Sequence, residues 1–155
     1  MSLYRFIVSE TPLEEADYSG FILLKVKDLL KLPQLPTGAI PWEELDGELE
    51  VLYAEDEDAA DGLCITLCHN PPYGLHNYVG SKHIYWLEGR VNTKWATQLY
   101  DYMKKHVPEG IKVELWSIWF GAYIQPITSI CMERTQLQIE DLLILSEMNK
   151  CIVVE

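Results

Sequence analysis

The stretch IKVELWSIW, residues 111–119, is a strong strand signal. Val113 and Leu115 alternate with Lys112 and Glu114, which is the period of two typical of a half-buried β-strand. Working outward from it, apolar runs bounded by turn residues predict further strands. These runs are Leu3–Val8, residues 48–53, residues 63–69, residues 83–88, residues 122–130 and residues 151–154.

Aromatic residues continue the central strand and make both of its faces apolar. The run WSIWFGAY covers residues 116–123. On a strand, Trp116, Ile118 and Phe120 share one face, and Ser117 and Trp119 share the other. One face must cover the core, and the other either lies under a helix or stays exposed to a protein partner. We expect these aromatics to be core, because large aromatic side chains are mostly buried.

Two segments carry helix signals. Asn92 or Thr93 can cap a helix that runs to about His106, with apolar residues at helical spacing along it. Gln138–Met148 reads as a second helix. Together with the strands, this predicts one α+β domain over residues 1–155. We expect a mainly antiparallel sheet of about five to seven strands and two main helices, at about 93–106 and 138–148.

Pairing of the strands is predicted from their order along the chain. Residues 48–53 and 63–69 are expected to form a hairpin across the turn AEDEDAADG. Residues 122–130 are the expected hairpin mate of 111–119, at a sheet edge because they contain Pro126. The run Phe21–Val26 predicts a well-buried strand or the start of a helix.

Smaller helical segments are also expected between the strands. Lys27–Leu32 predicts a short helix, and Pro41 with Trp42 opens a helical turn beside two glutamates.

The sequence lacks the apolar segments that direct a protein into or across a membrane. No apolar run approaches the ~20 residues of a membrane helix. The first residues, MSLYRFIVSETPLEE, lack the basic and long apolar regions of a signal peptide. We therefore expect a cytoplasmic protein whose four cysteines are free thiols.

Charge is the clearest functional signal. The chain has 24 acidic and 12 basic side chains and a net charge of −12. Residues 1–61 hold fifteen acids against four bases, whereas residues 62–155 hold nine against eight. The segment Glu43–Asp61 contains ten acids and no base. Such a surface repels nucleic acid and anionic membrane and attracts a basic protein, although a charge run is also typical of a merely solvated face.

The stretch CITLCHNPPYGLHNYVGSKH, residues 64–83, holds two cysteines and three histidines. These are the residue types of a metal site or a catalytic thiol site. On a strand, Cys64 and Cys68 share a face but stand roughly 13 Å apart, too far to share one zinc ion. Cys68 and His69 point to opposite faces, although His76 or His83 could reach Cys68 across the loop. We expect buried thiols and surface loop histidines with no metal, no cofactor and no catalytic residues.

The calcium-binding pattern is also absent. Counted from Asp56, the acids do not match an EF-hand, because position 5 is Ala60, the glycine falls at position 7 as Gly62, and position 12 is Leu67 instead of glutamate.

Three hypotheses follow from these patterns. The first is a non-enzymatic binding module that docks a basic partner, with the general character of small bacterial immunity proteins and nuclease inhibitors; no family motif identifies the chain as one of them. The second is a small enzyme or metal-binding protein that uses the Cys64–His83 region. The third is a homo-oligomer that buries its aromatics in its own interface. Under the first, the expected contacts are Trp42, Glu43, Glu44, Asp46, Glu55, Asp56, Glu57, Asp58 and Tyr73.

Overall fold

The computed structural model describes residues 2–81 and 83–155. The chain divides into two compact units: the larger takes the residues up to Ser19 together with Asp61–Glu155, and the smaller is Gly20–Ala60. The predicted α+β class is confirmed, with a mainly antiparallel sheet of seven strands. The assignment of residues 1–155 to a single domain stays a prediction.

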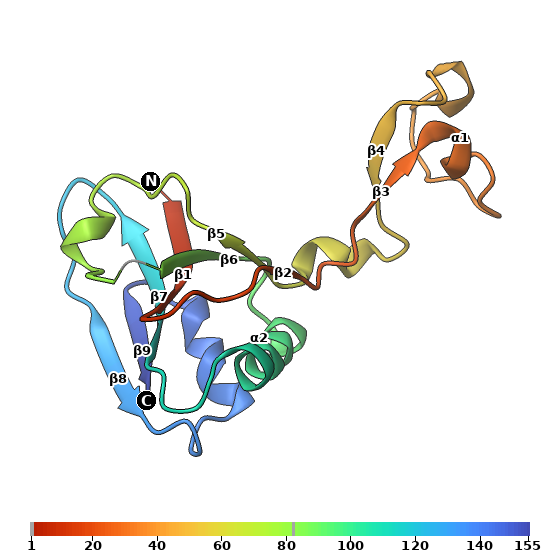
Figure 1. The fold of residues 1–155 in the computed structure, drawn as a ribbon. Coiled ribbons are helices and arrows are strands. Elements are labelled where there is room, and N and C mark those ends of the chain that lie inside the picture. The colour runs from red at the N-terminus through yellow and green to blue at the C-terminus, as the bar shows by residue number, and fades with distance from the viewer. Residues whose placement is uncertain (1, 82) are drawn as a thin grey trace. The chain divides into compact units, whose positions relative to one another are not determined.

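The seven-stranded sheet belongs to the larger unit and has the order β2-β5-β6-β1-β7-β9-β8 (Figure 1). All neighbours are antiparallel except β8 and β9, which run parallel. The strands are β1 (Ser2–Ser9), β2 (Ala16–Asp17), β5 (Cys64–Leu67), β6 (His83–Glu88), β7 (Val113–Phe120), β8 (Thr128–Met132) and β9 (Lys150–Val154).

The first strand lies in the middle of this sheet. β1 pairs with β7 along its whole length, from Ser2 opposite Phe120 to Ser9 opposite Val113, and with β6 on its other side. Because successive side chains point to opposite faces, a central strand of apolar residues demands cover on both faces.

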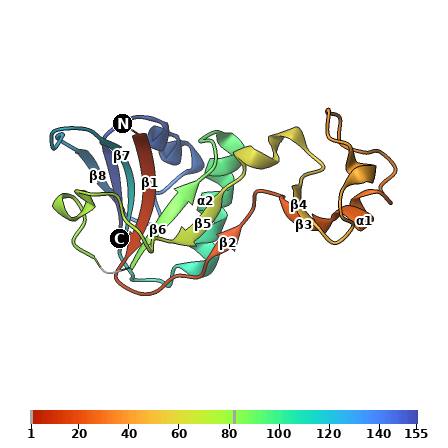
Figure 2. The same ribbon diagram turned by 90° about the horizontal axis from the view of Figure 1, so that it is seen from above.

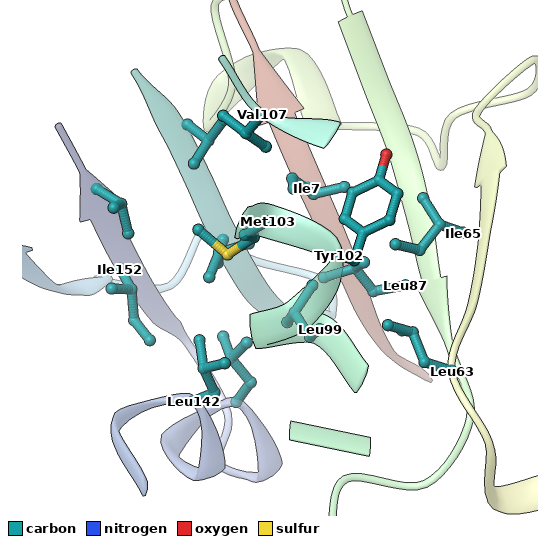
Figure 3. Close-up of a cluster of buried hydrophobic side chains, with 14 of the residues drawn as sticks. Ile7, Leu63, Ile65, Leu87, Leu99, Tyr102, Met103, Val107, Leu142 and Ile152 are labelled. Atoms are coloured by element: carbon teal, nitrogen blue, oxygen red, sulfur yellow. The ribbon is translucent and has the colours of Figure 1, made fainter. Parts of the chain in front are cut away.

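One face of the sheet is covered by helical segments. Helix α2 (Thr93–His106) and the helical segment η4 (Ile139–Ser146) pack on it. In the close-up of Figure 3, Leu99, Tyr102 and Met103 of α2 lie against Ile7 of β1 and Leu87 of β6. This is the larger of the two apolar clusters, and it holds the α2 side chains expected from helical spacing.

Helix α2 begins where the sequence predicts. The Asn92 side chain accepts a hydrogen bond from the Trp95 amide at 2.9 Å, which satisfies one of the free donors of the first turn. The indole of Trp95 is fully buried and donates to the Glu88 carbonyl at 2.9 Å, so the helix start is anchored to the end of β6. In the described part of the chain, no helix is both long and apolar enough to cross a membrane.

The second predicted helix forms with tighter geometry than expected. Instead of an α-helix over 138–148, the chain makes 3₁₀ turns over Ile139–Ser146, opened by a capping box between Gln138 and Asp141. Its last carbonyls are drawn to the sheet: Arg5 Nε donates to Leu145 O at 2.7 Å, and Ser117 Oγ donates to Glu147 O at 2.7 Å. Burial lowers the pKa of Arg5.

The opposite face of the sheet is covered by a loop. Phe6, Val8, Trp116 and Ile118 form a second apolar cluster, and Leu75 and Val79 from the loop after β5 complete it. Figure 2 shows α2 on one side of the sheet and this loop on the other. The expectation that the aromatic run is core holds for Trp116. Tyr123, at the end of that run, is 80% exposed.

The two predicted hairpins are wrong. β4 (Glu50–Tyr53) pairs with β3 (Ile22–Lys25) in a separate two-stranded ribbon, whereas β5 pairs with β2 and β6. The predicted mate of β7 is also displaced, because β9 takes the place beside β7 and β8 pairs with β9. β8 does lie at the sheet edge, although Pro126 precedes the strand and is not part of it. In both cases a strand distant in sequence outcompetes the nearest one, since apolar strands are sorted by burial as well as by loop length.

We predict that Leu75 stabilises the larger unit while its loop neighbour Tyr73 does not. Leu75 is 2% exposed and Tyr73 is 97% exposed. Leu75→Ala should lower the free energy of unfolding by about 2–5 kcal/mol, and Tyr73→Ala should change it by less than about 0.5 kcal/mol. Urea unfolding followed by circular dichroism measures both. Equal, small effects would mean that the loop does not cover the sheet.

Candidate functional site

The smaller unit carries eight of the nine predicted contact residues. It is built from β3, the short helix α1 (Val26–Leu29), the 3₁₀ turn η1 (Trp42–Glu44) and β4. The predicted turn at Pro41 and the predicted short helix after Phe21–Val26 are both present, the latter four residues long.

Charge in the smaller unit is strongly unbalanced. Gly20–Ala60 holds ten acids against three bases, a net of −7. All three bases are engaged: Lys25 Nζ lies 2.6 Å from Glu48 Oε2, Lys27 pairs with the other oxygen of Glu48, and Lys31 lies 3.2 Å from Asp28. The hydrogen bonds from Lys25 and then Lys27 lower the pKa of Glu48.

The remaining acids of this unit are therefore uncompensated. Each is exposed, and none forms an ion pair with another residue that the structure describes. Their charges add to a negative potential that salt can screen but no neighbouring lysine cancels. They are Glu43, Glu44, Asp46, Glu50, Glu55, Asp56, Glu57 and Asp58.

An apolar face accompanies these acids. In the β3–β4 ribbon, Leu23 lies opposite Leu52, and the two side chains are 66% and 64% exposed. The prediction of a well-buried strand at Phe21–Val26 is therefore wrong for the strand residues. In a ribbon of two strands, each strand has one neighbour and no further strand or long helix packs on its face. An apolar run in such a ribbon is therefore not necessarily buried.

Trp42 has a different environment from the one expected of an exposed contact residue. Its side chain is half-buried beside a cavity of about 150 Å³, which is also lined by Pro36 and by Val51, Leu52 and Tyr53 of β4. The indole Nε1 is buried and has no hydrogen-bond partner among the described residues. A buried donor without a partner is uncommon in proteins.

Tyr73, the ninth predicted contact, belongs to the larger unit. It lies at the tip of the loop that covers the sheet, with its ring 6.4 Å from that of His76. Its share in the same contact as the acids stays a prediction.

The thiols of the larger unit are shielded to different degrees. Cys64 and Cys68 are half-buried, less than expected, and burial raises the pKa of both. Cys151 is buried in the second apolar cluster, and burial raises its pKa to about 12. A raised pKa leaves less thiolate, the nucleophilic form, at neutral pH. In residues 2–81 and 83–155, no three His, Cys, Asp or Glu side chains gather in a way that could hold a metal ion.

The exposed leucine pair and the cavity were missed by sequence reasoning. The segment LLKVK, residues 23–27, did contain a signal that this strand is partly exposed, because Lys25 and Lys27 alternate with Val26 directly after the two leucines. Comparison with known proteins adds nothing further: no family model, no curated protein and no solved structure matches the chain.

We predict a strict order of thiol reactivity. With iodoacetamide at pH 8, the exposed Cys131 should be alkylated first and Cys151, which is 1% exposed, only when the protein unfolds. The raised pKa of Cys64 and Cys68 should slow both relative to Cys131. Mass spectrometry of timed samples gives the rates, and samples in urea should lose the differences. Alkylation of Cys68 ahead of Cys131 would instead favour a reactive thiol at Cys68.

Proposed function

We propose that the chain is a non-enzymatic protein-binding module, of the inhibitor or immunity type, which docks a basic protein partner through the smaller unit. One observation carries the proposal: eight exposed carboxylates without an ion pair lie in the same unit as an exposed apolar ribbon. The charges attract and orient a partner, and the burial of apolar side chains at the interface stabilises the complex. The unit contains both.

The sign of the charge selects the class of partner. A unit with a net charge of −7 repels the phosphates of nucleic acids and of anionic lipids. Lysine- and arginine-rich protein surfaces are attracted at long range, which raises the association rate at low salt. We place this activity in the cytoplasm, where the free thiols of the chain stay reduced.

We predict that removing carboxylates from the smaller unit weakens partner capture. The test variant is Glu43→Gln, Glu44→Gln, Glu55→Gln and Glu57→Gln combined. Rim charges contribute roughly 0.2–1 kcal/mol each, so retention of a basic partner should fall about tenfold. The immobilised protein is exposed to lysate of its source organism at about 0.05 M and about 0.5 M salt, a range that shortens the Debye length severalfold.

A matched control carries the same change in net charge on the larger unit. It combines Glu10→Gln, Glu109→Gln, Glu133→Gln and Glu140→Gln, all at exposed positions. Capture that is salt-sensitive, lost in the test variant and kept in the control supports docking through the smaller unit. Equal losses in both variants would mean that only total charge matters, and no basic protein at either salt would contradict the proposal.

A further inference from the structure

The β3–β4 ribbon is an incomplete sheet. Two strands alone are marginally stable in water, and a third strand or a packed helix is normally needed. Here α1 has only four residues, and Leu23 and Leu52 on one face remain about two-thirds exposed. The ribbon therefore has both a face and an edge at which another segment can add.

The backbone alternation identifies which groups at the edge are free. The Val26 amide donates to the Leu49 carbonyl at 2.9 Å, and the register places these residues opposite each other just beyond the ribbon. In an antiparallel pair, bonded and non-bonded positions alternate. The amides and carbonyls of Glu50 and Leu52 thus point away from β3, and no hydrogen bond to another described residue engages these outward groups.

A cavity lies against the same strand. Val51 and Tyr53 present one face of β4 and Leu52 the other, yet all three line the cavity of about 150 Å³ next to Trp42. Leu29 of α1 and Ala54 also line this cavity. Its size suits one benzene-sized apolar group.

The charges along β3 and β4 indicate which edge of the ribbon accepts another strand, and whether that strand comes from a second copy or from a basic partner. The β3 edge carries Lys25, whereas the β4 edge carries Glu50. Two copies joined by their β4 edges would bring like charges together, which destabilises a strand pair. A lysine or arginine from a basic partner opposite Glu50 would stabilise it.

We propose that the β4 edge accepts an extended, basic segment of the partner as a third strand, with one of its apolar side chains in the Trp42 cavity. This mode of binding rests on the proposed function. Main-chain hydrogen bonds to Glu50 and Leu52 supply affinity, and alternating side chains supply specificity: basic residues meet the acids and an apolar one fills the cavity.

The test uses two synthetic peptides of equal composition, written in one-letter code. One is KVKVKVKV, which alternates like a strand, and the other is KKKKVVVV, which does not. Affinity is measured by titration at 0.05 M salt, and amide hydrogen exchange of the ¹⁵N-labelled full chain is followed by NMR. The alternating peptide should bind about tenfold more tightly and should slow exchange at Glu50 and Leu52, with no slowing at Leu23.

Two variants separate edge pairing from charge. Leu52→Pro removes an outward donor on β4, and Leu23→Pro removes its counterpart on β3, so the first should abolish the preference for the alternating peptide and the second should keep it. Trp42→Phe replaces the indole that lines the cavity with a smaller ring and should weaken the alternating peptide selectively. NMR spectra of each variant check that it folds. If a proline variant does not fold, the peptide preference of Trp42→Phe is the test of strand addition.

The outcomes distinguish this inference from the proposed function. If both peptides bind equally, with salt sensitivity and no protection at Glu50 and Leu52, strand addition is overturned while acidic docking survives. If neither binds, both are overturned. Protection of Glu50 and Leu52 in the free protein that grows with its concentration would show pairing between copies and overturn the basic partner.

Discussion

Pairing between β1 and β7 is the constraint on which the larger unit depends. The first strand is apolar on both sides, with Phe6 and Val8 on one face and Ile7 on the other. Set between β6 and β7, it forces the sheet to have two covers. Helical segments supply one and a loop supplies the other. The loop after β5, which carries the predicted contact residue Tyr73, therefore covers the core through Leu75 and Val79.

The sequence was sufficient to locate most elements, and insufficient to pair them. Alternation identified β7, the apolar runs identified β1, β6 and β9, and the cap at Asn92 fixed the start of α2. Pairing failed at β4 and β8, because hydrophobic pattern gives the faces of a strand and says nothing of its neighbours. The 3₁₀ geometry of η4 was missed for a related reason: Arg5 and Ser117, which bind its last carbonyls, are remote in sequence.

The candidate site shows the same division between local and tertiary information. Acidity could be read directly, since a run of carboxylates needs no structure to be recognised. Three features could be seen only in the structure: Glu48 forms ion pairs with two lysines, the indole of Trp42 has no partner among the described residues, and the leucines of the β3–β4 ribbon are exposed. Each depends on which residues meet across the fold. The basic partner that we propose for this unit rests on both kinds of feature, since the acids set the sign of its charge and the exposed leucines offer apolar contact area.

The central place of β1 also has a consequence for biosynthesis. Ribosomes release β1 long before its neighbours, because Ser9 pairs with His83 on one side and Val113 on the other. At 5–20 residues per second, the strand waits roughly 4–15 s for its first partner. Throughout that interval an apolar strand with two open edges is available to other chains. The yield of folded protein should therefore depend on the speed of translation between β1 and β6 as well as on the final stability of the fold.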